Sequence, residues 1–242
     1  MSESDPTRDA VAQARDVLLL ALRHGDEDKP VIARIGRICV GLLRVDGASI
    51  SLIIDTDRRE VLYTSDEVVA RVEALQFSLG EGPCFEAFTT GRPVLVADLH
   101  AATISPWPIF AAEMADQPVG AIFAFPLTRG AIRLGAMDLY RERPGSLSAT
   151  DVAVALQVVD MVTLVVLGTD PRTMDAPWWN DLPTNRVQVH QATGMLIAAL
   201  HIPAHHALAR LRGYAFAGGR LVDDVADDLV ARRINALDFD KP

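Results

Sequence analysis

The chain has 242 residues, of which 50% are hydrophobic and 23% are charged, so it is long enough for two domains or for one large one, and each could bury a core. Its formal net charge of −9 disfavours general nucleic-acid binding, because that affinity rests largely on basic side chains that contact phosphates. Two cysteines make no disulfide framework, and neither a membrane-spanning run nor a signal peptide is apparent, so we expect a cytoplasmic protein without a membrane partner.

Periodicity predicts two helices at the start of the chain. Apolar side chains recur at three- and four-residue spacing over residues 9–23 and again over 30–43. Cys39 falls on the apolar stripe of the second helix, and we expect it to be a small core residue. We therefore set an N-terminal helical segment, 1–29, apart from the region that follows.

After residue 43 the pattern changes to short β-branched and apolar runs bounded by turn residues. These runs predict strands at 48–54, 61–63, 94–96, 121–127 and 131–140. Residues 56–59, with two arginines after an aspartate, are interpreted as a turn. A short helix is expected over 67–75, and a long one begins after a cap at Ser148 and ends at Gly168. This order predicts an α+β fold, an antiparallel sheet flanked by helices.

A glycine-rich stretch follows the short helix. Gly80 and Gly82 permit a left-handed or closely approached backbone, and Pro83 can open a helix that carries Cys84 near its N-terminus. A thiol there could have a lowered pKa and be reactive, but no histidine lies nearby in sequence, and a buried structural thiol is the favoured interpretation. We predict that Gly80, Gly82, Cys84 and Trp107 border a small or closed ligand pocket, which side chains could equally fill.

Four motifs in this region resemble a GAF domain. They are Gly-Glu-Gly-Pro-Cys at 80–84, Gly-Arg-Pro-Val at 91–94, Ala-Phe-Pro-Leu at 124–127 and Gly-Ala-Met-Asp-Leu-Tyr at 135–140. The resemblance covers residues 30–168 and implies a module that senses a small molecule or dimerises. The Asn-Lys-Phe-Asp-Glu signature of cyclic-nucleotide-binding members and the Cys-His pair of bilin-binding members are absent, so neither ligand is implied and no cofactor is expected.

The long helix before residue 168 predicts a homodimer. Between residues 152 and 167 only three side chains are polar, namely Gln157, Asp160 and Thr163. One side of such a helix can pack on the sheet, and the other apolar side needs a second cover. A symmetric partner chain could provide it, and so could the helix 9–23 of the same chain.

Residues 169–184 form a proline- and aspartate-rich linker, and three amphipathic helices are expected in 185–237. The linker contains Trp178 and Trp179, which could stack on a base or, more commonly, pack on a domain. The helices are predicted at 186–200, at 203–217 and from 222 to a last turn that holds Arg232 and Arg233. Residues 186–237 contain six arginines and four aspartates, a local charge of +2.

These helices resemble an ANTAR domain. The resemblance is carried by Val-His-Gln-Ala-Thr-Gly-Met-Leu at 189–196, Ala-Leu-Ala-Arg-Leu-Arg at 207–212, and Leu221 followed by Val225-Ala226. It implies a module of bacterial regulators that binds the loops of short RNA hairpins and promotes transcription antitermination. The family's usual Ala-Lys-Gly is Ala-Thr-Gly at 192–194, so a cation is missing where RNA contact is expected.

On a helical wheel, four residues of the second helix share a face away from its apolar stripe: His206, Arg210, Gly213 and Ala217. Small residues allow close approach there, and a guanidinium can hold a phosphate or stack on a base. The residues predicted to contact RNA are Gln191, Thr193, Gly194, Arg210, Arg212, Gly213 and Arg220.

Catalytic and metal-binding motifs are not apparent in the sequence. His201, His205 and His206 do not form a helical metal site, because Pro203 starts a new helix between the first and the other two. We therefore predict a non-enzymatic, signal-responsive regulator in which a GAF-like sensor controls an RNA-hairpin-binding antitermination domain. The alternative is a sensory or scaffolding dimer whose helical domain binds protein and not RNA.

Overall fold

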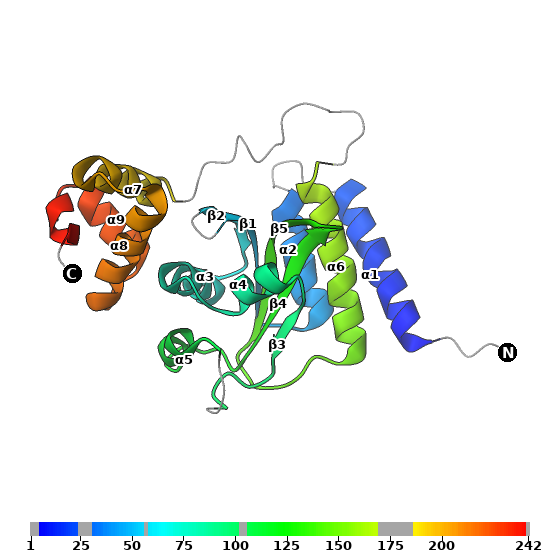
Figure 1. Cartoon of the computed structure of the whole chain (residues 1–242). Helices are drawn as coiled ribbons and strands as arrows, with labels where there is room; N and C mark the ends of the chain where they lie inside the picture. Colours follow the sequence, from blue (N-terminus) through cyan, green and yellow to red (C-terminus); the bar gives the residue numbers. More distant parts are fainter. Residues whose placement is uncertain (1–4, 24–30, 56–57, 102–105, 169–185, 241–242) are drawn as a thin grey trace.

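The computed structural model describes residues 5–23, 31–55, 58–101, 106–168 and 186–240. It contains an α+β unit, built from residues up to 168, and a smaller helical bundle built from residues 186–240 (Figure 1). The structure confirms the predicted antiparallel sheet flanked by helices. It also confirms that a helical region follows the sheet.

The sheet has five antiparallel strands in the order β2-β1-β5-β4-β3. The strands are β1 (Gly47–Asp55), β2 (Arg58–Thr64), β3 (Val94–Val96), β4 (Ala121–Arg129) and β5 (Ile132–Arg141). The β4–β5 hairpin lies where the apolar runs 121–127 and 131–140 predict two successive strands. The predicted turn at 56–59 is wrong at its end, because Arg59 lies in β2 with its side chain only 1% exposed.

Helices cover both faces of the sheet (Figure 1). One face packs against α1 (Pro6–Arg23), α2 (Val31–Leu43) and α6 (Ala149–Val166), and the other carries α3 (Glu67–Leu79), α4 (Pro83–Thr90) and α5 (Pro108–Met114). The alternation along β1 shows the division, since Ile50 and Leu52 belong to the core under α2 and α6, whereas Ser49 and Ser51 point toward α3.

Helix α6 is covered within its own chain. It is long and apolar enough to cross a membrane by length and composition, but it packs between the sheet and α1. Val158 is fully buried there, and Leu18 of α1 belongs to the same core. The cover supplied by α1 is the intrachain alternative to a dimer. The predicted cap is confirmed, because Ser148 and Asp151 form a reciprocal capping box.

The bundle consists of α7 (Val187–Leu200), α8 (Ala204–Ala217) and α9 (Val222–Val230), followed by the short 3-10 helix η2 (Ala236–Asp240). The predicted apolar stripes form its core. The end of the third helix was predicted wrongly: α9 stops at Val230, Arg232 has a left-handed φ of 57°, and Arg233 lies beyond the last turn. The helix closes there because the Arg233 N–H donates back to the carbonyl of Asp228 at 2.8 Å.

Candidate functional site

A cluster of polar side chains lies between the sheet and α3, and we call it the interior polar cluster: Ser49, Ser51, Arg59, Glu73, Gln76 and Asp138. The carboxylate of Glu73 accepts hydrogen bonds from both serine hydroxyls of β1 and forms an ion pair with Arg59. The Arg59 guanidinium also lies 5.3 Å from the centroid of the Phe85 ring. The Arg59–Glu73 pair can be buried because the two charges compensate each other and the serine hydroxyls add hydrogen bonds to the carboxylate.

Asp138 adds a second carboxylate to the cluster. Gln76 Nε2 donates to its Oδ2 at 2.7 Å, and β-sheet register places it opposite Ser49. Burial, and after it the negative charge of Glu73, raise the pKa of Asp138 to about 7 against the opposing effects of Arg59 and of the Gln76 hydrogen bond. Among the residues described, Asp138 Oδ1 and the Nε and Nη1 atoms of Arg59 are buried without a hydrogen-bond partner. The cluster therefore holds unused hydrogen-bonding capacity.

Two of the four predicted pocket residues lie against this cluster. The Cys84 N–H donates to Gln76 Oε1 at 2.8 Å, so Gln76 bridges α4 and β5. A Cβ on Gly82 would lie 2.6 Å from the same oxygen, which explains the glycine. Cys84 is fully buried, and burial raises the pKa of its thiol well above the ordinary value, as expected for a structural and unreactive cysteine.

The other two predicted pocket residues lie elsewhere. Gly80 is the left-handed C-cap of α3 and faces Arg212 of the bundle. Trp107 precedes α5 and packs edge-to-face on Phe110, with ring centroids 6.4 Å apart, in a separate apolar cluster. The loop that holds both glycines is linked to the start of α5, because Glu81 Oε1 accepts hydrogen bonds from the Ile109 and Phe110 N–H groups at 3.0 and 2.8 Å. Gln76 fills the space beside Gly82.

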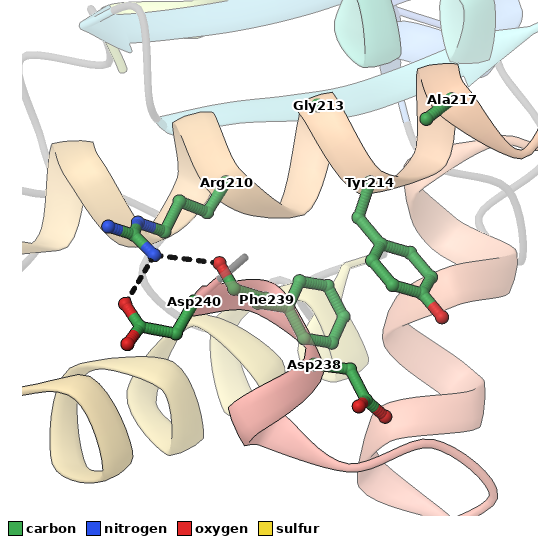
Figure 2. Close-up of a pocket in the computed structure, with 7 residues that line it drawn as sticks. All are labelled: Arg210, Gly213, Tyr214, Ala217, Asp238, Phe239 and Asp240. Atoms are coloured by element: carbon green, nitrogen blue, oxygen red, sulfur yellow. Dashed lines mark hydrogen bonds and ion pairs between the residues drawn. The ribbon is translucent and has the colours of Figure 1, made fainter. Parts of the chain in front are cut away.

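Two of the predicted RNA-binding residues, Arg210 and Gly213, line a groove beside α8. The groove has a volume of about 630 Å³ and lies between α8 and η2. Figure 2 shows the residues that line it: Arg210, Gly213, Tyr214, Ala217, Asp238, Phe239 and Asp240. Arg210 Nη1 donates to the Phe239 carbonyl at 2.8 Å and to Asp240 Oδ1 at 2.7 Å. The rings of Tyr214 and Phe239 stack with centroids 4.3 Å apart. Arg210 and Gly213 thus share a site with an aromatic pair.

The remaining predicted residues do not join this groove. Arg212 points away from it, because two residues turn an α-helix through about 200°, and its Nε donates to the Phe77 carbonyl of α3 at 3.1 Å. Arg220 pairs with Asp228 at 2.7 Å. On α7, Thr193 Oγ1 donates to the Val189 carbonyl at 2.7 Å, whereas Gln191 and Gly194 are exposed.

Metal binding finds no support in the described part of the chain, where no group of three His, Cys, Asp or Glu side chains is close enough to hold an ion. His205 and His206 pack edge-to-face with ring centroids 4.2 Å apart. Trp178 and Trp179 lie outside the described residues.

Sequence reasoning missed two parts of the site. It ended α3 at residue 75, whereas the helix runs to Leu79 and carries Phe77 into contact with the bundle. Gly80 was the available signal, because a glycine in the left-handed conformation commonly follows the last helical residue. It also missed η2, which is too short to show a period.

The first unit is an α+β domain with a five-stranded antiparallel sheet, and comparison with known proteins identifies its family. Residues 32–166 match the GAF domain family, and this match covers more than half of the chain. The chain belongs to the GAF domain family, whose members suggest a signal-sensing role. The family match ends before α7, so it does not extend to the bundle.

Solved structures of GAF and related domains resemble the chain in fold. The GAF domain of a phosphoenolpyruvate-protein phosphotransferase from Coxiella burnetii has a TM-score of 0.54 at 11% identity, covering 69% of this chain and 98% of that one. A domain of a two-component sensor histidine kinase protein from Sinorhizobium meliloti 1021 has a TM-score of 0.46 at 18% identity, covering 59% and 93%. Free methionine-R-sulfoxide reductase from Neisseria meningitidis has a TM-score of 0.44 at 17% identity, and the match covers 67% of this chain and 91% of that one. No curated protein matches the chain.

Proposed function

We propose that the chain is a signal-responsive regulator that binds RNA hairpins through its bundle and controls transcription antitermination. The observation that carries the proposal is the ANTAR-like run of residues 185–234, in which the helix-forming stripes and the polar positions between them follow one family's pattern. The GAF domain supplies the sensing half of this function.

The groove of Figure 2 has the chemistry that an unpaired nucleotide requires. Arg210 offers a guanidinium for a phosphate, and the half-buried Tyr214, whose ring stacks on the buried Phe239, offers an aromatic edge for a base. Gly213 and Ala217 present no long side chain that would block approach along α8. A single-stranded loop exposes its phosphates and its unpaired bases together, so a hairpin is favoured over a continuous duplex as the partner.

Several further properties belong to this proposal. The chain acts in the cytoplasm without catalytic activity of its own, and a small molecule bound by the GAF domain provides the signal. It works as a homodimer that presents two bundles to RNA. Since α1 covers α6, the partner surface includes the exposed residues Leu20 of α1 and Leu156 of α6, which are 58% and 44% exposed.

A second candidate function is supported by the ion pairs of the bundle. Arg210 and Arg220 are both paired with carboxylates of the bundle itself, which leaves less positive charge for phosphates. The bundle also docks on a protein surface, namely α3 of the sensor. These contacts fit a scaffolding dimer whose helical domain binds protein.

Binding of the full chain to short RNA hairpins with randomised loops separates the two functions. We expect selective, salt-sensitive binding to a subset of loops, weakened by Arg210→Ala with a loss of about one unit in the salt slope. Thr193→Lys should strengthen it by restoring the missing cation. Arg129→Ala, which removes an exposed arginine from the sensor hairpin, is the charge-matched control. Equal binding of hairpins and duplexes by every variant would favour the protein-binding function.

A further inference from the structure

The bundle is docked on the sensor through the C-terminal end of α3, the sensor helix that lies beside the bundle in Figure 1. Phe77 belongs to the sensor in sequence, but its side chain is 1% exposed and lies in the hydrophobic cluster of the bundle with Leu196 and Leu211. The sensor thus supplies one residue of the bundle's core, and separating the units would expose it to water.

Two arginines of the bundle flank the Phe77 ring. The guanidinium carbon of Arg186 lies 3.8 Å from the ring centroid, and that of Arg212 lies 5.1 Å from it. Both distances are within the range of cation–π attraction, which strengthens where water is excluded. Arg212 Nε also donates to the Phe77 carbonyl, so one sensor residue holds this arginine through its ring and its backbone.

The next residue of α3 completes the contact. Ser78 Oγ accepts a hydrogen bond from the Val222 N–H at 3.0 Å, and this N–H is one of the donors that the start of α9 leaves without an intrahelical partner. Gly80 then ends α3 beside Arg212 with a left-handed φ of 68°, a conformation that favours glycine. We call Phe77 and Ser78, with Arg186, Arg212 and Val222, the α3 latch.

The α3 latch is connected to the interior polar cluster through neighbours in sequence. Gln76 faces inward and donates to Asp138, whereas Phe77, the next residue, enters the bundle. On β2, Arg59 joins the interior cluster, and Glu60 beside it contacts His190 of α7 at 3.2 Å. A shift of α3 against the sheet would therefore change both sets of contacts.

We propose that the α3 latch is autoinhibitory: it holds Arg212 against the sensor, away from RNA, until a change in the interior polar cluster moves the end of α3. That the α3 latch inhibits RNA binding rests on the proposed RNA function, whereas the contact between α3 and Arg212 can be measured without RNA. Arg212 lies in the ANTAR-like run and is the predicted RNA contact that the sensor engages directly.

Two variants of the full chain open the latch to different degrees. Phe77→Ala removes the ring, and Ser78→Ala removes only the acceptor for Val222, so the second keeps the apolar core if the first does not fold. Ile132→Ala, at a 55% exposed position of β5, is the control. The first readout is the rate at which phenylglyoxal modifies Arg212, followed by mass spectrometry. If about 90% of molecules are latched, full release raises this rate about tenfold.

The second readout is the affinity for hairpins recovered from the randomised-loop pool. We expect phenylglyoxal to modify Arg212 faster in both opened variants than in the wild type. Both variants should also bind these hairpins more tightly, by up to about tenfold, while the control matches the wild type in both readouts. Unchanged Arg212 modification in both variants would overturn the latch. Faster modification with unchanged hairpin affinity would overturn the inhibition and keep the RNA function. Faster modification with no hairpin binding by any variant would overturn the RNA function, and with it the inhibitory role.

Discussion

The two units of the chain bury different chemistry. On the α3 side of its sheet the sensor encloses Arg59, Glu73 and Asp138, three ionisable groups held by hydrogen bonds. In the described part of the bundle, residues 186–240, the buried side chains are apolar except that of Arg186, which lies at the contact with the sensor. An apolar core gives a rigid platform, whereas a buried polar cluster can respond to a ligand or a proton. This difference agrees with the proposed function, in which the sensor responds to a signal and the bundle carries the output surface.

Glu73→Ala should have the largest effect on stability, because it leaves Arg59 buried without its carboxylate and removes the acceptor for Ser51. Breaking a buried pair on one side costs about 3–5 kcal/mol in the free energy of unfolding, measured by urea denaturation. Glu67→Ala, at an exposed position in the first turn of the same helix, should cost less than about 1 kcal/mol.

A double variant sharpens this prediction. Replacing both partners of the pair, as Arg59→Met with Glu73→Met, should recover most of the lost stability, since it leaves neither charge uncompensated. A double variant as unstable as Glu73→Ala would show that packing, and not charge, sets the cost.

Phe239→Ala tests whether the bundle depends on its apolar core. Phe239 is 3% exposed and stacks on Tyr214, so its truncation should lower the free energy of unfolding by about 3 kcal/mol. Leu237→Ala in the same short helix, at a 60% exposed position, should be close to neutral. Equal effects of the two would mean that η2 does not pack on the bundle in solution.

Asp138→Asn tests the titratable part of the sensor. Because folding raises the pKa of Asp138 from 3.8 to about 7, its contribution to stability is fully present below pH 3.8 and is lost as pH rises through 7. Between pH 6 and pH 8 this loss is about 1.4 kcal/mol. The asparagine can still accept from Gln76, so the variant should lack this loss. Parallel pH profiles for the variant and the wild type would contradict the assignment.

Arg210→Ala should have the smallest effect on stability. Its ion pair with Asp240 lies at the surface, with side chains 38% and 64% exposed, and such pairs contribute less than about 1 kcal/mol. The same variant should weaken hairpin binding, so the effects on stability and on binding separate. A large loss of stability would assign Arg210 a structural role through the Phe239 carbonyl.

Local patterns predict most of the elements, and long-range contacts account for what they miss. The β4–β5 hairpin, the Ser148 cap and the burial of Cys39 follow from neighbours in sequence. The sequence pattern places Arg59 in a turn, and only the fold brings it to Glu73.

The contacts of the output arginines depend even more on the tertiary structure. Phe77 and Arg212 are separated by 135 positions in the sequence, so no local period reveals their contact. Helical periodicity separates Arg210 from Arg212 on α8, but only the fold places the first in the groove beside η2 and the second against the sensor.

Sequencing the RNA that co-purifies with the full chain from its host tests the central claim most directly. The proposed function predicts enrichment of short hairpins, strong with Phe77→Ala, weaker with the wild type, and reduced when Arg210→Ala is combined with Phe77→Ala. Arg129→Ala in the same background should leave the enrichment unchanged. Recovery of the folded Phe77→Ala protein without any hairpin enriched over total cellular RNA would contradict the claim that the bundle is an RNA-binding output domain.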